Sequence, residues 1–244
     1  MKLVALKIEK IVEGENVVLF PVLIQNEGRN YLVDCGYEET FEEVKSQLET
    51  LGVEIKDLTG VVITHDDHDH LGGLKLLKQN NSSIKVYCGE FEKDSVSGIT
   101  KSERLAQAES SLAAIPEDYK TWALNFIRIL KSVQRFGVDR TLADNEYFEN
   151  DITVIHTPGH TKGHISLFYP KEKTLIAGDS LVIEDGKLNI ANPHFTLNIE
   201  AAIKSVEKIK MLNPQRIICY HGGVMDKNID KELEELIDKY KAIE

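Results

Sequence analysis

The segment at residues 64–73, THDDHDHLGG, concentrates side chains that can bind metal ions. Within it, three histidines and three aspartates fill six consecutive positions, directly after the apolar residues 61–63. Imidazole nitrogens and carboxylate oxygens together suit Zn, Fe or Mn. A β-branched apolar run that ends in such a cluster is typical of a buried strand delivering ligands from a loop at its carboxyl end. A solvated charged loop is the alternative, but such loops rarely contain imidazoles, so the sequence favours a metal site.

Further candidate ligands lie where other predicted strands end beside glycine. All eight histidines of the chain fall between residues 65 and 221. The segments that combine a strand end, a polar side chain and glycine are 33–36 (VDCG), 157–160 (TPGH), 177–179 (AGD) and 219–223 (CYHGG). Layered α/β folds place their ligand sites at strand ends, so the sequence favours a shared site for these segments and the first cluster.

The elements that must position these groups alternate between strands and helices. The predicted strands are 2–9, 16–24, 31–33, one that ends at Thr64, 152–156, 165–169, 174–177 and 216–219. The predicted helices are 41–51, a short one from Leu74, the segment 102–134, 199–211 and 227–243. Pro21 indicates an edge position or a bulge in the second strand. This alternation predicts a layered α/β fold.

Composition limits the class of protein and its partners. At 244 residues, with 42% hydrophobic and 28% charged side chains and no linker or repeat, the chain is expected to be one globular domain. A net charge of -11 argues against nucleic acid or an anionic membrane as partner, and favours a small-molecule substrate. The N-terminus lacks the long apolar region of a signal peptide, and no stretch is long enough to span a bilayer. We therefore expect a cytoplasmic protein, either a monomer or a homodimer.

Taken in order, these motifs resemble the metallo-β-lactamase superfamily. In that family T-H-x-H-x-D-H-x-G-G, T-P-G-H, G-D and a late His supply a two-metal site, and the resemblance here runs from Asp34 to Gly223. It implies a four-layer αββα sandwich with the metals at one edge of its two sheets. On this basis, residues 1–244 form a single metallo-β-lactamase-fold domain, with a helical insertion at about 100–147.

The resemblance also implies a role for each matching residue. The first metal would be held by His65, Asp67 and His160, the second by Asp69, His70 and His221, and Asp179 would bridge them. Asp34 resembles a residue that orients a ligand or a loop without binding metal itself. The cofactors implied are two divalent metal ions, with Zn as the first expectation.

Position 67 departs from the commonest family pattern. Where the second histidine usually stands, this chain has Asp67. Subfamilies with a carboxylate at this position include the flavodiiron proteins, which carry Glu. The added negative charge makes the site more neutral and favours harder ions, so Fe or Mn gains weight beside Zn. In an alternative arrangement, His68 turns inward and replaces Asp67 as the ligand.

The resemblance implies metal-dependent hydrolysis. A metal-bridged hydroxide would attack a carbonyl, and Asp69 would orient the nucleophile and accept its proton. The compact chain is most similar to the lactonase and glyoxalase II-like branches, which implies a small ester, lactone or thioester as substrate. The alternatives are a phosphodiesterase of the same fold, a di-iron redox protein related to flavodiiron proteins, and a metal-bearing binding module without turnover.

Several other side chains are candidates for contact with substrate. His194, Lys162 and Tyr220 are the predicted pocket residues, and the helical insertion would cover the site. Tyr119 or Trp122 would then touch substrate, but for Trp122 the sequence favours a role in core packing. His156 and His164 are interpreted as structural, the first at a strand end and the second as an anchor of the strand that follows it.

Overall fold

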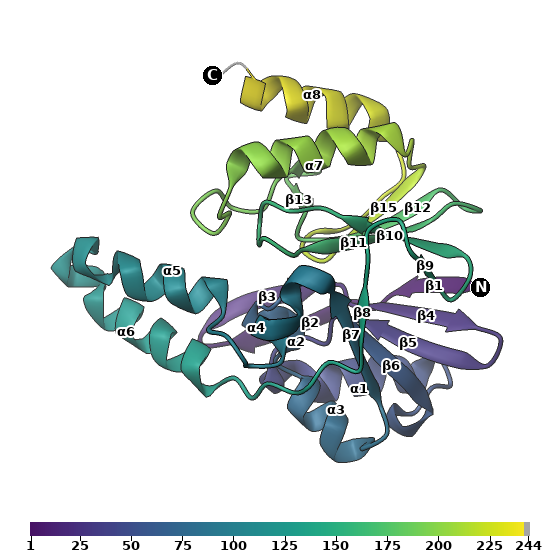
Figure 1. The fold of residues 1–244 in the computed structure, drawn as a ribbon, viewed down its shortest axis with the longest axis horizontal. Helices are drawn as coiled ribbons and strands as arrows, with labels where there is room; N and C mark the ends of the chain where they lie inside the picture. Colours follow the sequence, from purple (N-terminus) through teal and green to yellow (C-terminus); the bar gives the residue numbers. More distant parts are fainter. Residues whose placement is uncertain (242–244) are drawn as a thin grey trace.

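Two six-stranded sheets form the centre of the protein in the computed structural model, which describes residues 1–241 (Figure 1). In the first sheet the strand order is β1-β4-β5-β6-β7-β8. The last four strands run parallel, whereas β1, β4 and β5 pair in antiparallel fashion. The strands are β1 (Lys2–Ala5), β4 (Val22–Asn26), β5 (Arg29–Val33), β6 (Leu58–Ile63), β7 (Lys85–Gly89) and β8 (Arg140–Leu142).

The second sheet has the order β16-β15-β12-β11-β10-β9. Its strands are antiparallel except for the parallel pair β12 and β15. The strands are β9 (Tyr147–Phe148), β10 (Ile152–His156), β11 (Ile165–Tyr169), β12 (Thr174–Gly178), β15 (Arg216–Cys219) and β16 (Gly223–Met225). Two hairpins lie outside the sheets, β2 (Ile8–Val12) with β3 (Glu15–Leu19) and β13 (Val182–Glu184) with β14 (Lys187–Asn189).

Helices cover the outer face of each sheet. Figure 1 shows α1 (Phe41–Thr50) and α3 (Leu74–Asn80) on one side of the molecule, and α7 (Ile199–Met211) and α8 (Ile229–Lys241) on the other. This arrangement confirms the predicted αββα sandwich. The shorter helices are α2 (His68–Leu71), α4 (Lys93–Val96) and the 3₁₀ turns Glu38–Thr40, Ile55–Asp57, Glu90–Glu92 and Leu112–Ala114.

The alternation of side chains along the strands divides the apolar core into layers. Leu32 of β5 packs in the cluster that includes α1 and α3, whereas its neighbours Tyr31 and Val33 face the second sheet. Successive side chains of a strand point to opposite faces, and both faces of these strands are covered. The runs of buried residues in β6, β11 and β12 follow from this double coverage.

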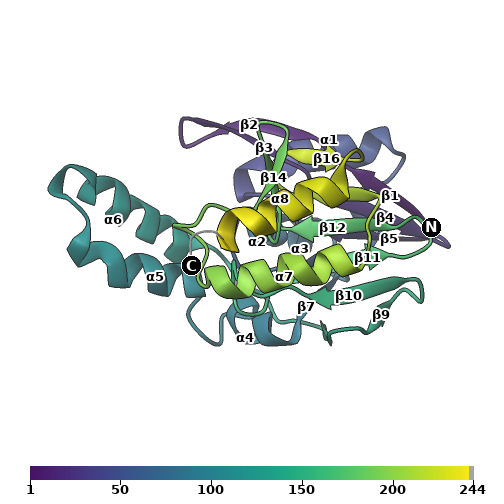
Figure 2. The ribbon, with the colours of Figure 1, turned by 90° about the horizontal axis from the view of Figure 1, so that it is seen from above.

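The segment that was expected to be a helical insertion contains a helical hairpin and two strands. Its helices, α5 (Glu103–Ser111) and α6 (Glu117–Ser132), project from the sandwich on one side (Figures 1 and 2). The Ser102 side chain caps α5 by accepting a hydrogen bond from the Leu105 N–H at 3.1 Å. After Ser132 the chain supplies β8 to the first sheet and β9 to the second, so the helical part ends well before residue 147.

Two predicted strands are each divided in the structure. The chain leaves β1 after Ala5 and enters the β2–β3 hairpin at Ile8, and the strand expected at 16–24 is interrupted between Leu19 and Val22. Pro21 lies in that interruption because it has no N–H to donate, and its carbonyl accepts from Leu6 N at 2.8 Å. The hairpin therefore separates from the sheet at both strand boundaries.

The C-terminal helix begins at Ile229, two residues later than predicted, and residues 242 and 243 of that prediction lie outside the described residues. Within residues 1–241, no helix has both the length and the apolar character needed to cross a membrane.

Phe148 packs in the core between the two sheets, and its substitution tests how much this core contributes to stability. It is 1% exposed, and its ring meets Tyr31 and Tyr87 of the first sheet edge-on, with centroids 5.0 and 5.4 Å apart. Phe148→Ala should lower the free energy of unfolding by about 3–5 kcal/mol, because it leaves a cavity between the sheets. Tyr147→Ala is the control, since Tyr147 is 65% exposed, and should change stability by less than about 0.5 kcal/mol in the same denaturant titration. Equal losses in the two variants would contradict this account.

Candidate metal centre

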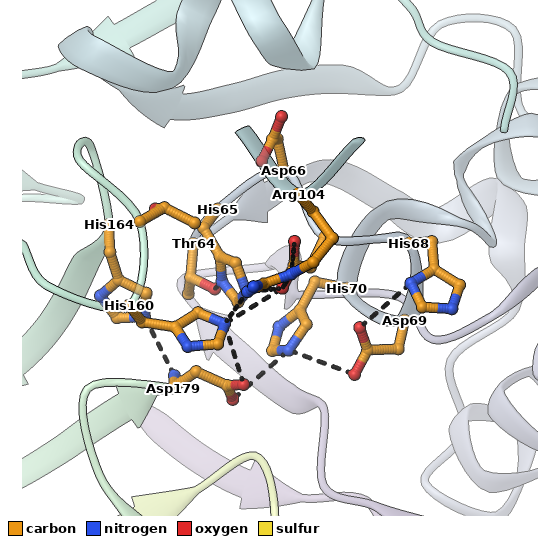
Figure 3. A network of polar contacts seen from close by, with 12 residues as sticks. Thr64, His65, Asp66, His68, Asp69, His70, Arg104, His160, His164 and Asp179 are labelled. Atoms are coloured by element: carbon orange, nitrogen blue, oxygen red, sulfur yellow. Dashed lines mark hydrogen bonds and ion pairs between the residues drawn. The ribbon is translucent and has the colours of Figure 1, made fainter. Parts of the chain in front are cut away.

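The carboxyl ends of strands from both sheets meet at one edge of the sandwich. His65 follows β6 of the first sheet, Asp179 follows β12, and His221 follows β15 of the second. His160 lies in the loop between β10 and β11. Figure 3 shows His65, His70, His160 and Asp179 converging from these different elements. The structure therefore brings residues that are up to 156 positions apart in sequence into one cluster.

The first group in this cluster contains His65, Asp67 and His160. The Oδ2 atom of Asp67 lies 3.6 Å from His65 Nε2 and 3.0 Å from His160 Nε2. One potential ligand atom from each residue lies within 4.8 Å of the other two, and all three residues are buried. The spacing suits a single metal ion.

A second group contains Asp69, His70 and His221. The Asp69 Oδ2 atom is 3.6 Å from His70 Nε2 and 3.2 Å from His221 Nε2. These residues also meet the 4.8 Å spacing, although His221 is only partly buried. The cluster therefore contains two neighbouring groups of possible ligands.

Asp179 lies between the two groups. Its Oδ1 atom is 3.4 Å from His70 Nε2, and its Oδ2 atom is 3.6 Å from His160 Nε2 and 3.5 Å from His221 Nε2. One carboxylate thus contacts nitrogens from both groups. This is the position that a bridging ligand requires.

Buried atoms without hydrogen-bond partners support the fit to divalent cations. Among the described residues, His65 Nε2, His70 Nε2 and Asp179 Oδ1 are buried and have no hydrogen-bond partner. A buried polar atom without a partner carries a desolvation cost of about 1–3 kcal/mol, which coordination would offset. Although burial opposes charging, the carboxylates of Asp179 and Asp69 raise the pKa of His221 to about 10. The surroundings of His221 therefore favour positive charge, as a cation site must.

Asp34 holds the histidines of both groups in one orientation. Its Oδ1 accepts from Thr64 N at 2.8 Å, and its Oδ2 accepts from Thr64 Oγ1 at 2.8 Å and from His70 Nδ1 at 2.9 Å. Because Thr64 donates its only hydroxyl proton to Asp34, it must accept from His65 Nδ1 at 3.1 Å. Protons on both Nδ1 atoms leave both Nε2 lone pairs free to bind metal. Asp34 thus selects the tautomer of both imidazoles.

His164 supports Asp179 from behind. Its Nε2 accepts a hydrogen bond from Asp179 N at 2.9 Å, and its Nδ1 lies 2.8 Å from Thr157 Oγ1. Complete burial lowers the pKa of His164 well below its usual value, so the ring is neutral and can accept this bond. Gly178 is required beside it, because its φ is +56° and a Cβ there would lie 2.6 Å from His164 Nε2. His164 therefore positions the Asp179 loop as well as the strand that follows it.

The two remaining members of the first motif belong to neither group of possible ligands. Asp66 pairs with Arg135, whose Nη1 lies 3.4 Å from Asp66 Oδ2. His68 is partly buried, and its ring lies 5.1 Å from that of Tyr37 and 5.7 Å from that of Phe126. In Figure 3, Asp66 and His68 lie at the periphery of the cluster. The geometry thus groups Asp67, and not His68, with His65 and His160.

The main residue that sequence reasoning missed is Arg104. It is the buried residue of α5, whereas the apolar Leu105 and Ala108 of the same helix are only partly buried. Its guanidinium donates from Nη2 to Asp67 Oδ2 at 2.8 Å, and Nη2 lies 3.2 Å from His160 Nε2. A single arginine in a helix whose other side chains are partly buried or exposed carries no sequence signal for such a contact. Only the folding of α5 onto the sandwich brings it there.

A cleft of about 500 Å³ opens over the cluster. Asp67, Asp69, His160, Asp179 and His221 form its polar base. Its walls include Tyr37, Trp122, Phe126, Ile183 and Phe195. A second cavity of about 390 Å³ adjoins it and shares Arg104, Trp122, Phe126, Asn192 and Phe195. Glu13, Glu15 and Glu184 also line the first cleft, so its apolar surface is concentrated around Trp122, Phe126 and Phe195.

The three predicted pocket residues differ in whether they line these cavities. His194 lines the second cavity, whereas neither Lys162 nor Tyr220 is among the described residues lining either one. Tyr220 is buried beneath His70 and donates its hydroxyl to the Asp69 carbonyl at 2.6 Å. Lys162 is exposed, and its carbonyl lies 3.0 Å from His156 Nε2.

Comparison with known proteins places the chain among metal-dependent hydrolases. The family described as the metallo-beta-lactamase superfamily matches residues 20–221. A probable metallo-hydrolase, YflN of Bacillus subtilis (strain 168), is 26% identical over 224 residues, which cover 87% of this chain and 83% of that protein. The hydroxyacylglutathione hydrolase of Bartonella henselae is 28% identical over 175 residues, covering 70% of this chain and 51% of that protein.

A solved structure has the same fold. It is that of a metallo-beta-lactamase family protein from Thermus thermophilus, with a TM-score of 0.71 and 20% sequence identity. The similarity covers 98% of this chain and 79% of the other.

The Asp34 network makes a prediction about metal affinity. Asp34→Asn should lower the affinity for zinc by about 10- to 100-fold, because an amide cannot accept all three hydrogen bonds that orient Thr64 and His70. Asn tolerates the φ of +58° at this position, so the fold should persist. Competition with a chromophoric chelator measures the change. Asp151→Asn, which removes a surface partner of Lys171, is the control; equal affinity in all three proteins would refute the role assigned to Asp34.

Proposed function

The chain belongs to the metallo-β-lactamase superfamily, and on that premise we propose that it is a two-metal hydrolase of a small ester, thioester or lactone with an apolar acyl group. The observation that carries the proposal is the Asp179 carboxylate, which lies within 3.6 Å of nitrogens from both groups of possible ligands. We further infer that residues 1–244 form one domain, with α5 and α6 as its helical insertion. The cytoplasmic location and the choice between monomer and homodimer stay predictions.

We assign the ligands of the two metal ions from these groups. The first ion is assigned to His65, Asp67 and His160, the second to Asp69, His70 and His221, and Asp179 to both. When bound, the ions supply Lewis-acid activation of a carbonyl and of water at neutral pH. This is why no serine or cysteine nucleophile is needed.

The protein's own groups complete the chemistry at the base of the cleft. Asp69 lines the cleft, and its Oδ1 lies 3.8 Å from the partly exposed His68 ring. We assign Asp69 the role of orienting the attacking water and accepting its proton. Trp122 and Phe126 line one wall of the cleft above these groups.

The shape of the cleft supports an apolar acyl group. The rings of Trp122 and Phe126 are stacked, with centroids 5.5 Å apart and planes inclined by 8°. Trp122 is 56% exposed, so its expected role in core packing is wrong, and its ring is open to the cleft. Because both rings line the cleft and the adjoining cavity, an acyl chain could extend from the metal centre between them. The similarity to a hydroxyacylglutathione hydrolase adds support for thioesters within this class.

Zinc is our proposed metal, and Asp67 keeps iron and manganese as candidates. With Asp67, Asp69 and Asp179, the assigned ligands include three carboxylates, which reduce the net positive charge of a two-metal centre and favour harder ions.

Asp67 also supports a second candidate function, a di-iron redox protein. Two irons in the isolated protein, with oxygen consumption and no hydrolysis, would favour that second function over the first.

Asp179→Ala tests the two-metal centre directly. The variant should lose metal and hydrolysis together, by more than the ~10- to 100-fold typical of removing an outer partner of a ligand, and should keep its circular dichroism spectrum. Metal analysis should be combined with a screen over lactones, thioesters and phosphodiesters. Asp185→Ala in the β13–β14 turn is the control. Unchanged turnover in Asp179→Ala would exclude the proposed mechanism, and cleavage of phosphodiesters alone would correct the substrate class.

Trp122→Ala tests the proposed acyl site. It should raise KM for a hexanoyl or benzoyl ester by roughly 10-fold, because the ring's apolar contact area is lost, and should leave the acetyl ester nearly unchanged. Leu124→Ala is a matched control, since Leu124 lies on the same helix, is 54% exposed and lines neither cavity. An equal change for long and short acyl groups would argue against an acyl site at Trp122.

A further inference from the structure

We infer that Arg104 competes with a metal ion for Asp67 and His160, so that the two metal positions fill unequally and the position at Asp69, His70 and His221 fills first. The inference rests on the ligand assignment of the proposed function. It concerns the order and strength of metal binding, which that function leaves open.

Arg104 already makes the contacts that a cation at the first position would make. Its Nη2 donates to Asp67 Oδ2 at 2.8 Å, and its Nε lies 3.3 Å from Oδ1 and 3.2 Å from Oδ2. Both oxygens of the Asp67 carboxylate are therefore engaged. The same Nη2 is 3.2 Å from His160 Nε2, the nitrogen assigned to metal. Arg104 is 3% exposed, so this is a buried ion pair with little screening by solvent.

The second position has no such competitor. Within the described part of the chain, the recorded ion-pair partners of Asp69 and Asp179 are all imidazoles. An imidazole can lose its proton and become a ligand, whereas a guanidinium stays charged under all physiological conditions. A metal ion at the second position therefore replaces protons, but one at the first position must displace Arg104 or share Asp67 with it.

The rest of the Arg104 side chain has contacts that could retain it after displacement. Its Nη1 donates to Gln107 Oε1 at 2.6 Å, and its Cζ atom lies 5.2 Å from the centre of the Phe195 ring. A cation over an aromatic face is attracted by the ring, so Phe195 offers the guanidinium an alternative partner. Arg104 and Phe195 line both cavities. Filling of the first metal position would thus also change the wall of the proposed acyl site.

Metal titration of the full-length protein tests this inference. Protein stripped with a chelator is titrated with zinc alone, and the two dissociation constants are obtained by equilibrium dialysis and competition with a chromophoric chelator. Wild type should bind one ion tightly and a second at least about 10-fold more weakly. Arg104→Gln should tighten the weaker site by roughly 10-fold and leave the tight site unchanged. Arg104→Lys, which keeps a cation, should tighten it less.

Two further variants separate competition from a structural role of Arg104. Arg128→Gln on α6 removes an exposed arginine that bonds to Asn125, and should leave both constants unchanged. Asp67→Asn should weaken only the weaker site, which identifies that site as the first position even if Arg104→Gln fails to fold. Near-ultraviolet circular dichroism checks the fold of each variant.

The possible failures are distinguishable. Two equal constants in wild type, or an unequal pair that Arg104→Gln does not change, would overturn the competition and leave the two-metal hydrolase intact. Loss of the tight site in Asp67→Asn would reverse the proposed order of filling and also overturn the inference. If the wild-type protein binds no zinc, manganese or iron, that result would instead contradict the proposed function itself.

Discussion

The burial of several carboxylates at one edge of the sandwich is the constraint on which the rest of the site depends. Asp34, Asp67, Asp69 and Asp179 are each no more than 9% exposed. An isolated buried carboxylate is costly, so each of these must have hydrogen-bond donors or positive charge nearby. Imidazoles, a threonine, backbone N–H groups and one guanidinium supply them. Among the described residues, the buried atoms without a hydrogen-bond partner include His65 Nε2, His70 Nε2 and Asp179 Oδ1, which belong to the proposed ligand groups.

Each of the two sheets supplies one of these carboxylates together with the residues that hold it in place. The first sheet supplies a rigid carboxylate at the end of β5, Asp34, which fixes the imidazoles that follow β6. The second supplies Asp179 at the end of β12, held from behind by the neutral ring of His164. Left-handed backbone positions lie at both ends: Asp34 has a φ of +58° and Gly178 a φ of +56°. Glycine adopts this conformation without steric cost, whereas at Asp34 it persists because the surrounding contacts determine it, which is typical of functional sites.

The layered α/β fold and the candidate ligands could be predicted from the sequence because both depend on local patterns of residues. Apolar runs identify strands such as β6 and β12, and residues 64–73 form one contiguous motif. The failures arose where position depends on packing between distant segments. The helical segment at 102–134 was predicted, but not that Arg104 would be the buried side chain of α5, since the contact with Asp67 depends on how that helix packs. Likewise, Tyr220 and Lys162 were predicted to line the pocket, but the direction of each side chain depends on how the loops after β15 and β10 pack.

The carboxylate at position 67 and the arginine at position 104 are best understood together. An imidazole at position 67 would give a guanidinium no charged partner, and burying Arg104 there would be costly. With Asp67 present, the first position remains charge-compensated whether a metal ion or Arg104 occupies it. Because Arg104 belongs to the helical hairpin that forms the wall of the cleft, the same substitution links the metal centre to the proposed acyl site. The departure from the usual family pattern at one position thus carries consequences for both metal binding and substrate recognition.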